Sequence, residues 1–390
     1  MSNNKNRKQG EQYSNNGCKD PVDEVSGFCA DPYEGKGKTV VVGMSGGVDS
    51  SVTALLLKRR GYRVIGANHV VLPEDDNLKS SPLEGIKRLT DFLDIPFVTV
   101  NLQDTFQESI ISNFIDIYFD GGTPNPCVLC NEEIKFGAFL DVVRKELLSK
   151  NLIDKDITLY FATGHYVKTD VHNGTCFIYK GIDTNKEQSY MLYRVNEKLL
   201  PFLVFPLGGY TKPDVYKIAK EAELPLPEKN ESQDVCFIPG SYTDYLSGKV
   251  SETQLPGPGP IIDRYGTRLG THRGYLFYTI GQRKGLGLSD GPWYVAGTDA
   301  DTNTVTVARK KQLGKTSFSI EALKEFHNEL SAERICRVSV RYQSKEAECR
   351  VVRTGNATAE VFPEVPLVVT PGQSAVFYEK DRLLGGGTIM

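Results

Sequence analysis

The amino-acid sequence predicts an α/β fold in which a doubly wound parallel sheet is followed by a small central domain and a C-terminal antiparallel β-barrel. From Thr39 onward, runs of β-branched residues alternate with helical stretches, which is the pattern of a doubly wound sheet. Beyond the proline-rich segment 255–260, the chain changes to short alternating runs separated by glycines and charged turns. This second pattern favours an antiparallel barrel or sandwich.

The parallel sheet is expected from four strands and four helices that alternate along the chain. The strands are expected at 39–42, 63–67, 97–102 and 160–163. The helices are expected at 52–60, 83–93, 106–119 and 134–147. Because open α/β sheets bind their ligands outside the carboxyl ends of the strands, we expect functional residues at the strand ends.

Composition divides the chain into four parts. Residues 1–37 are polar with few aliphatic side chains, which is typical of a disordered tail. Residues 38–205 form the expected sheet domain, and residues 206–258 form the expected central domain, which contains a helix at 211–222. Residues 259–390 form the expected barrel, and the proline-rich segment marks the boundary before it.

Overall composition limits the class of protein. The chain has 390 residues, of which 39% are hydrophobic, and a net charge of −3. No apolar stretch approaches the ~20 residues of a membrane span, and the polar N-terminus lacks the apolar core of a signal peptide. Eight cysteines over this length fit free thiols in a reducing compartment better than a disulfide scaffold. We therefore expect a cytoplasmic protein with no membrane contact.

The run VVVGMSGGVDSS, residues 40–51, joins the first strand to the first helix through small residues. Gly46 and Gly47 let a phosphate approach the backbone, the serines supply hydroxyls, and the N–H groups of the helix start point at the anion. Asp49 is then expected to hold Mg²⁺ against the phosphates. The order differs from Walker A and from the dinucleotide fingerprint. It resembles the loop of the ATP pyrophosphatases, which cleave ATP to AMP and pyrophosphate; a plain Gly-Ser turn is the alternative.

Three cysteines stand in segments that are typical of chemistry. Cys127 and Cys130 follow a rigid Thr-Pro-Asn-Pro segment and precede an expected helix, where the pKa of a thiol is lowered. A lone C-x-x-C is compatible with a metal or cluster site, a redox pair, or structural cysteines. Cys236, in ESQDVCFI, is a third thiol that lacks the spacing of a second zinc half-site.

Eight motifs together resemble the tRNA-specific 2-thiouridylase family, which replaces the C2 oxygen of the wobble uridine of tRNA with sulfur. The motifs are SGGVDSS, ATGHY at 162–166, TPNPxxxCN, KxQSY at 186–190, FPLG at 205–208, SQxxCFI, TIGQRKGLG at 279–287, and TPGQ with LGGG within 370–387. The resemblance extends from about residue 38 to the C-terminus.

The resemblance implies a reaction and roles for individual residues. Transfer of AMP from ATP makes the unreactive C2 oxygen a leaving group, with Mg²⁺ and the loop stabilising pyrophosphate. Cys236 is expected to carry a persulfide from a cysteine desulfurase or relay protein, and Cys130 to complete release through a transient disulfide. The tRNA substrates are expected to be of the Lys, Glu and Gln class. Contacts with ATP are expected at Gly43, Met44, Ser45, Gly46, Gly47, Val48, Asp49, Ser50, His69 and Gly164. Contacts with the target base or tRNA are expected at Asn125, Pro126, Cys127, His165, Lys186, Glu187, Gln188, Arg341, Tyr342 and Gln373.

Cys127 departs from the better-known family pattern, which has aspartate at this position as a base or orienting carboxylate. A thiol cannot take that role unchanged, and two accounts remain open. In the first, Cys127 is a resolving thiol within the persulfide route. In the second, Cys127, Cys130 and Cys236 bind a [4Fe–4S] cluster through three irons, and the fourth iron holds a sulfide for transfer.

Two other classes of protein share parts of this pattern. An amidating or ligating ATP pyrophosphatase, such as argininosuccinate or GMP synthetase, has the loop but needs no cysteines around its substrate. A non-catalytic RNA-binding relative needs neither an intact loop nor the thiols.

The segment 264–284 carries five basic side chains and no acid, interleaved with aromatic residues. The basic residues are Arg264, Arg268, Arg273, Arg283 and Lys284. A solvated charged face is the ordinary interpretation of such a run. Because the segment has one sign of charge in a chain of negative net charge, we favour contact with a phosphate backbone.

Overall fold

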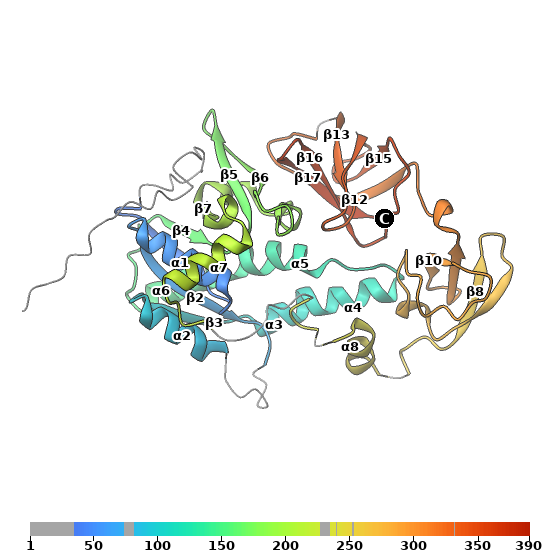
Figure 1. Cartoon of the computed structure of the whole chain (residues 1–390), viewed down its shortest axis with the longest axis horizontal. Coiled ribbons are helices and arrows are strands. Elements are labelled where there is room, and N and C mark those ends of the chain that lie inside the picture. The colour runs from blue at the N-terminus through green and yellow to red at the C-terminus, as the bar shows by residue number, and fades with distance from the viewer. Residues whose placement is uncertain (1–34, 74–81, 227–234, 239, 252, 331) are drawn as a thin grey trace, which may run out of the picture.

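The computed structural model describes residues 35–73, 82–226, 235–238, 240–251, 253–330 and 332–390. Figure 1 shows a sheet with its helices at one end, a small sheet at the other, and a barrel above the helices α4 and α5 that run between them. The predicted tail 1–37 lies almost entirely outside the described residues. Within the described ranges, every helix is too short or too polar to cross a bilayer.

The first sheet is parallel and has the strand order β3-β2-β1-β4-β7. Its strands are β1 (Thr39–Gly43), β2 (Arg63–Val70), β3 (Phe97–Asn101), β4 (Leu159–Ala162) and β7 (Leu203–Val204). The four predicted strands are therefore confirmed. The short β7 at the edge is an addition that two residues are too few to indicate by pattern.

Helices cover both faces of this sheet, as the sequence predicted. Because side chains alternate along a strand, Val40 and Val42 pack in one hydrophobic cluster with α1, α2 and α7, whereas Val41 packs in another with α6. On the first face lie α1 (Val48–Arg59), α2 (Pro82–Phe92) and α7 (Lys212–Glu221). The other cluster includes residues from α3 (Gln103–Phe106), η1 (Gln107–Ile111), α4 (Ser112–Phe119), α5 (Pro126–Leu129), η2 (Cys130–Ala138) and α6 (Phe139–Ser149).

The C-terminal barrel is antiparallel, with the strand order β12-β15-β14-β13-β16-β17, and it closes through pairing of β12 with β17. Its strands are β12 (Phe318–Glu325), β13 (Glu333–Ser339), β14 (Ala347–Arg353), β15 (Ala359–Pro363), β16 (Ser374–Glu379) and β17 (Arg382–Ile389). The hairpin of β5 (Val167–His172) and β6 (Thr175–Lys180) leaves the parallel sheet and joins the barrel where Tyr179 pairs with Arg382. The predicted β-barrel is confirmed.

The range 259–390, predicted as one barrel, contains two separate sheets. A four-stranded sheet of order β10-β11-β8-β9 precedes the barrel. Its strands are β8 (Gly259–Asp263), β9 (Arg268–His272), β10 (Tyr294–Asp299) and β11 (Thr304–Ala308), and the helix α8 (Tyr242–Lys249) precedes it. Alternating runs and turns indicate strands, but they do not specify which strands pair, and the sequence pattern therefore did not separate the two sheets.

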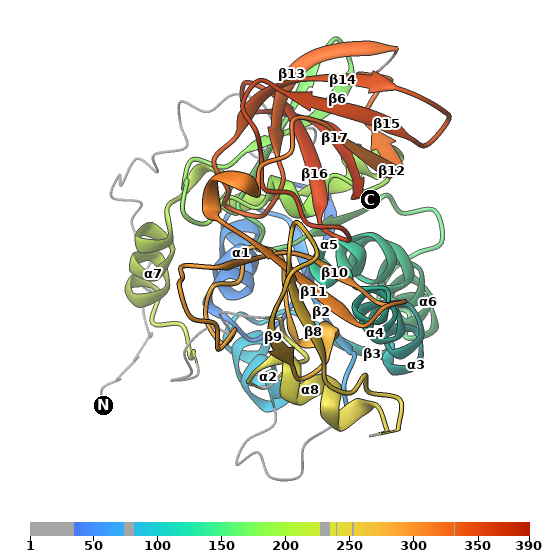
Figure 2. The same ribbon diagram turned by 90° about the vertical axis from the view of Figure 1, so that its right-hand side faces the viewer.

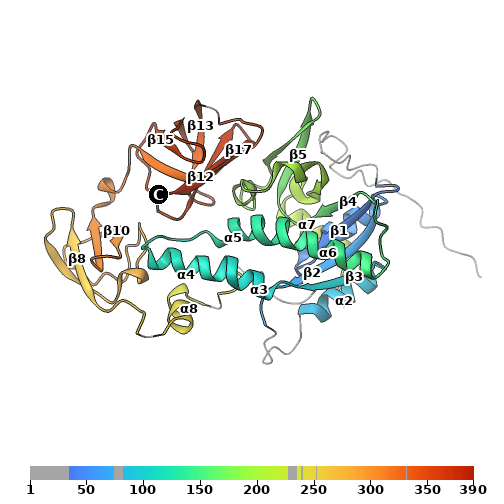
Figure 3. The ribbon, with the colours of Figure 1, turned by 180° about the vertical axis from the view of Figure 1, so that it is seen from behind.

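One helical rod connects these parts. The segments α3, η1 and α4 follow one another from the end of β3 to Phe119, as Figure 3 shows from behind. At its far end, Thr298 Oγ1 donates to the Gly121 carbonyl at 2.6 Å, and Tyr118 stacks on Tyr242 at 4.9 Å between ring centroids. Thr123 N donates to the Pro371 carbonyl of the barrel at 2.8 Å. The barrel and the small sheet thus both contact the segment that follows the rod, and the turned view in Figure 2 shows the barrel above the small sheet.

Short 3-10 helices complete the described structure. They are η3 (Ser189–Leu192), η4 (Glu197–Phe202), η5 (Pro206–Gly209), η6 (Tyr275–Phe277) and η7 (Lys310–Gln312).

Candidate active site

The loop between β1 and α1 is held open by its own hydrogen bonds. Gly46 has φ +81°, a conformation that suits glycine. Ser50 Oγ donates to the Gly47 carbonyl at 3.1 Å and accepts from Ser45 N at 3.2 Å. In the described structure no side chain caps α1 at Gly47, so that the first N–H groups of the helix remain available to an anion.

Asp49, on the first turn of α1, is held by two side chains. Lys212 Nζ lies 2.8 Å from both carboxylate oxygens, and Tyr166 Oη donates to one of them at 2.6 Å. The Lys212 side chain is only 9% exposed, whereas that of Asp49 is 31% exposed. The carboxylate is therefore oriented at the mouth of the loop by a buried cation.

A cavity of about 190 Å³ opens at the carboxyl ends of β1, β2 and β4. It is lined by Gly43, Met44, Ser45, Asp49, Ser50, His69, Lys135, Phe139, Phe161, Thr163, Gly164, His165 and Gln188. Seven of the ten residues expected to contact ATP are in this set; Gly46, Gly47 and Val48 are not, and Val48 packs in the core instead. His165 and Gln188, which were expected beside the base or tRNA, also line this cavity.

Both histidines of the cavity are held neutral. Burial, followed by the charge of Lys135, lowers the pKa of His69 to about 4. The same two causes lower the pKa of His165 well below its ordinary value, and Thr163 Oγ1 lies 2.7 Å from its Nδ1. His69 Nδ1 is buried without a hydrogen-bond partner among the described residues. A nucleotide would thus meet neutral imidazoles rather than cations on this wall.

Cys127 and Cys130 lie at the start of the helical segment that forms another wall of the cavity. Asn125 precedes α5, and Pro126 occupies its first turn, where a missing N–H is harmless. Cys130 then opens η2, a π-helix, and Gly137 near its end has φ −109° and ψ −108°. The sequence predicted the helix but not its π-helical first part.

Cys236 reaches the site because its neighbour is anchored in an aromatic cluster. The ring of Phe237 is buried and lies 5.6 Å from Phe106 and 5.3 Å from Phe114, both on the helical rod. Phe237 also packs against Tyr245 at 5.4 Å. Cys236 lies exposed beside this cluster, close enough for its charge to act on Cys127 and Cys130.

The pKa values of the three thiols contradict the sequence expectation. We expected a lowered pKa at a helix start, but burial raises the pKa of Cys127, of Cys236, and of Cys130, the last to about 11. The charge of Lys135 opposes this shift at all three thiols, and Cys236 in turn raises the pKa of the other two. Desolvation therefore outweighs the charge of Lys135 at each thiol, although Cys127 and Cys236 are exposed at the surface and Cys130 is half-buried, and the influence of Cys236 on the other two indicates that the three thiols lie near one another.

Metal-ligand geometry is not formed by these thiols. Across the described ranges, no group of three or more His, Cys, Asp or Glu side chains is arranged to hold a metal ion. The described thiols therefore form no site for a single metal ion, and their attachment to a [4Fe–4S] cluster, in which each thiolate binds a different iron, stays a prediction. For Mg²⁺, the single carboxylate of Asp49 is compatible with a site completed by phosphates and water, but Lys212 now occupies both of its oxygens.

Several residues expected beside the base or tRNA gather where the 123–127 loop meets the barrel. Gln373 Nε2 donates to the carbonyls of Thr123 and Pro124 at 3.1 and 2.9 Å. Tyr342 lies close enough to Glu187 and Cys127 that their charges contribute to raising its pKa, after burial. Lys186 and Arg341 are at the surface of the same region, Lys186 half-buried and Arg341 exposed.

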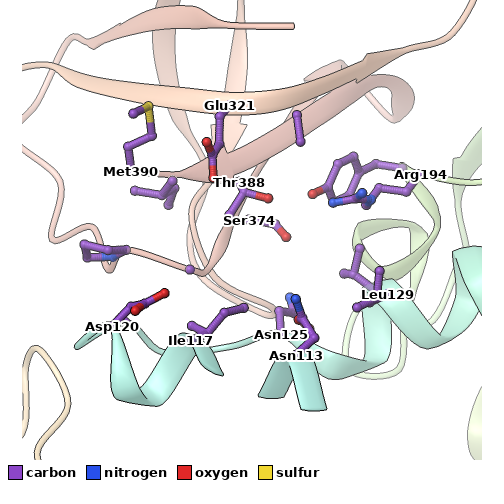
Figure 4. Close-up of a pocket in the computed structure, with 17 residues that line it drawn as sticks. Asn113, Ile117, Asp120, Asn125, Leu129, Arg194, Glu321, Ser374, Thr388 and Met390 are labelled. Atoms are coloured by element: carbon purple, nitrogen blue, oxygen red, sulfur yellow. The ribbon is translucent and has the colours of Figure 1, made fainter. Parts of the chain in front are cut away.

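A larger cavity of about 430 Å³ lies beside this loop, between the helices and the barrel. Figure 4 shows Glu321, Ser374, Thr388 and Met390 of the barrel opposite Asn113, Ile117, Asp120 and Asn125. Asn125 lines this cavity, but none of the three thiols does.

Sequence reasoning missed two cations of the site. Lys212 is the first residue of α7, and the N-terminus of a helix disfavours a cation unless an acidic side chain lies opposite it. The position of this lysine therefore indicated an acidic partner such as Asp49. Lys135 gave no such signal, because a lysine within a helical run is ordinarily solvated.

Together, the parallel sheet, the Ser-Gly loop before α1 and the cavity beside it define a nucleotide-binding α/β enzyme. Residues 38–240 match the family model of the tRNA methyl transferase HUP domain, 244–309 that of the tRNA methyl transferase PRC-barrel domain, and 315–389 that of the aminomethyltransferase beta-barrel domain. The chain is 40% identical over 372 residues to the tRNA-specific 2-thiouridylase MnmA of Natranaerobius thermophilus, covering 90% of this chain and 97% of that protein. It is 41% identical over 369 residues to tRNA-specific 2-thiouridylase MnmA 1 of Caldanaerobacter subterraneus subsp. tengcongensis, with 90% and 97% coverage. The chain belongs to the tRNA-specific 2-thiouridylase family.

Among solved structures, a 4-thiouridine synthetase in complex with RNA and bound ATP is 16% identical, with a TM-score of 0.32. The match covers 48% of this chain and 42% of that chain, which is too slight a similarity to bear on function.

Proposed function

We propose that this enzyme uses ATP to convert C2 of the wobble uridine of tRNA to a thiocarbonyl, in tRNAs of the Lys, Glu and Gln class. The observation that carries the proposal is that one helical segment, 126–139, serves both parts of the site. It begins with Cys127 and Cys130, and its later residues Lys135 and Phe139 line the cavity beside the phosphate loop. An activated base in this cavity would therefore lie next to the thiols.

The first half-reaction is adenylation of the base. The uracil C2 oxygen attacks the α-phosphorus of ATP, the bond from that phosphorus to the β-phosphate oxygen breaks, and pyrophosphate leaves. The N-terminus of α1 binds the departing phosphates, because its first N–H groups have no side-chain cap, and the hydroxyl of Ser50, which donates to the Gly47 carbonyl in this structure, lies beside them. Mg²⁺, when bound through Asp49 and the phosphates, would supply charge neutralisation, and Lys212 keeps the carboxylate oriented.

The second half-reaction is sulfur transfer. The outer sulfur of a persulfide on Cys236 attacks C2, a C2–S bond forms, and AMP leaves with the former C2 oxygen. The Cys130 thiolate then attacks Sγ of Cys236, which breaks the S–S bond and leaves the outer sulfur on C2 as a thiocarbonyl. The outer sulfur is reduced, the two cysteines are oxidised to a disulfide, and the proton of Cys130 goes to solvent. An external thiol reductant restores the pair, and a cysteine desulfurase or relay protein supplies the next persulfide.

The tRNA is expected to lie across the barrel, the 123–127 loop and the small sheet. The exposed Arg273 stacks on Phe277 with 4.7 Å between guanidinium carbon and ring centroid, and Arg264 lies 5.4 Å from the ring of the exposed Tyr265. Such exposed cation and aromatic pairs fit a phosphate backbone with unstacked bases.

Substitution of each thiol tests this proposal. The assay combines tRNA transcript, ATP, a cysteine desulfurase and cysteine, and measures 2-thiouridine by nucleoside mass spectrometry. We expect Cys130→Ser and Cys236→Ser to abolish thiolation and Cys127→Ser only to slow it, because that thiol neither carries nor releases sulfur. Cys349→Ala, which removes a buried thiol of the barrel, is the matched control and should retain activity.

Two outcomes would contradict the proposed chemistry. Thiolation by Cys236→Ser at the wild-type rate would exclude this sulfur carrier. If all three serine variants instead lost activity together with iron, sulfide and visible absorbance after anaerobic reconstitution, a cluster would replace the persulfide route.

A further inference from the structure

Lys135 stands between the nucleotide cavity and the thiols. It supplies the only ammonium or guanidinium group among the described residues that line the cavity. Its side chain is half-buried, and within the described part of the chain no hydrogen bond or ion pair engages it. Asp49, the carboxylate of the same cavity, is already held by Lys212. The charge of Lys135 therefore remains available to a ligand.

The π-helical turn accounts for this position. Cys130 and Lys135 are five residues apart, and in an α-helix of 3.6 residues per turn the fifth residue onward is rotated by about 140°. The i to i+5 hydrogen bonds of a π-helix instead place it roughly one turn above the first residue. Cys130 opens η2, and the kink at Gly137 lies beyond Lys135, so that both residues stand in one helical stretch before the kink and this spacing places them on a similar side.

Gly137 permits this geometry. A Cβ atom added there would lie 2.8 Å from the carbonyl oxygen of Glu132, closer than Cβ atoms are found in proteins. The position of the turn is also fixed from outside, because Glu132 forms ion pairs with Arg194 and with Lys324 of the barrel. Lys135 is thus presented by a segment that is held on both sides.

The charge of Lys135 acts on five titratable groups around the site. It lowers the pKa of each, after the larger effect of burial. These groups are His69 on β2, His165 after β4, Cys127 on α5, Cys130 on η2, and Cys236 beside the aromatic cluster. The positive charge of Lys135 disfavours the protonated, cationic form of the two histidines and favours the thiolate form of the three cysteines.

We propose that Lys135 is a catalytic residue of both half-reactions, which binds the α-phosphate during adenylation and then stabilises the thiolate of Cys130 during sulfur release. The inference rests on the proposed function and names the group that links its two steps. A lysine suits this double role because its ammonium is a compact charge on a flexible stem. AMP leaves between the two steps, so the ammonium passes from phosphate to sulfur without a change in its own protonation.

The first test measures thiol reactivity without tRNA or ATP. Wild type, Lys135→Met, Lys135→Arg and Lys145→Met are treated with iodoacetamide across pH 6 to 10, and alkylation of Cys130 and Cys236 is followed by peptide mass spectrometry. Removing a cation raises the pKa of a thiol, so at pH 8 we expect Lys135→Met to react about threefold more slowly. Lys135→Arg should restore most of the rate. Lys145 is exposed on α6, and its substitution should change nothing.

The second test measures ATP affinity by calorimetry with the same four proteins. Lys135→Met lacks the ammonium that meets the α-phosphate and should therefore bind ATP roughly tenfold more weakly than wild type. Its affinity for pyrophosphate, measured in the absence of AMP, should change by less than twofold. Circular dichroism and a thermal melt establish that each variant is folded. If Lys135→Met does not fold, Lys135→Arg provides the second measurement.

Failure of this inference is distinguishable from failure of the proposed function. If Lys135→Met retains wild-type alkylation rates and ATP affinity, the role of Lys135 is refuted even if thiolation of tRNA proceeds. If wild type does not thiolate tRNA while both measurements respond to Lys135→Met, the proposed reaction fails and the electrostatic link stands.

Discussion

Substitution of Gly164 by alanine tests whether the nucleotide cavity depends on close approach of two backbones. A Cβ atom added at Gly164 would lie 2.9 Å from Cβ of Asp49 and 3.1 Å from the backbone N of Ser50. Carbon atoms pack at about 3.5–4.0 Å, so the two segments must separate by roughly 0.6–1 Å. Helix α1 cannot retreat, because Val52, Ala54 and Leu56 on it are buried in the core.

The strain therefore falls on the walls of the cavity. Overpacking of this kind costs about 1–3 kcal/mol, and 1.4 kcal/mol corresponds to a tenfold change in affinity. We expect Gly164→Ala to bind ATP about tenfold more weakly in isothermal titration calorimetry at fixed Mg²⁺ concentration, because the N–H donors of α1 move away from the phosphates. Gly209→Ala is the matched control, since no atom lies within 4 Å of the Cβ added there. ATP affinity of Gly164→Ala within twofold of wild type would refute the reasoning.

Three further predictions concern the loop, the surface and the thiols. Asp49→Asn should remove ATP-dependent thiolation, because the carboxylate orients phosphate and metal, while tRNA affinity in a filter-binding assay stays within twofold of wild type. Full thiolation activity in this variant would refute the assignment of Asp49 to the nucleotide site. Arg273→Ala should reduce the slope of log affinity for tRNA against log salt by about one, and an unchanged slope would return the basic segment to an ordinary solvated surface. Because burial raises the pKa of Cys130 to about 11, its thiolate fraction grows nearly tenfold per unit between pH 7 and 9. Single-turnover sulfur release from preformed persulfide should rise with pH over this range, and a flat profile would show that deprotonation of Cys130 does not limit the step.

The parts of the fold that were predictable are those set by local patterns. Strands β1 to β4 were recognisable because buried β-branched runs alternate with helical stretches, and the loop before α1 because glycine and serine interrupt a strand. The hairpin β5–β6 was not predicted, since its partner β17 lies some two hundred residues further along the chain. Pairing over such separations is decided by tertiary packing rather than by the pattern of one segment.

The candidate site was predictable to a similar depth. Motifs indicated the loop, His69, Gly164 and the cysteines, but not how water is excluded around them. The expected lowering of thiol pKa was wrong for this reason, because desolvation is the largest influence on the pKa of Cys130 and raises it. Lys135 was unpredictable because its orientation depends on a π-helical turn, which no sequence period reveals.

The π-helical turn also constrains how this segment can vary in length. A helix with i to i+5 hydrogen bonds accommodates one residue more than an α-helix that joins the same two ends. Deletion of the exposed Glu133 would allow η2 to relax to an α-helix, with helix content and core packing preserved. Cys130 and Lys135 would then be four residues apart, and residues four apart in an α-helix lie on the same face, so the two side chains would still share a side. The segment should therefore tolerate loss of this one residue, whereas an insertion at the same position, which would put the lysine six positions after Cys130, should separate the two side chains.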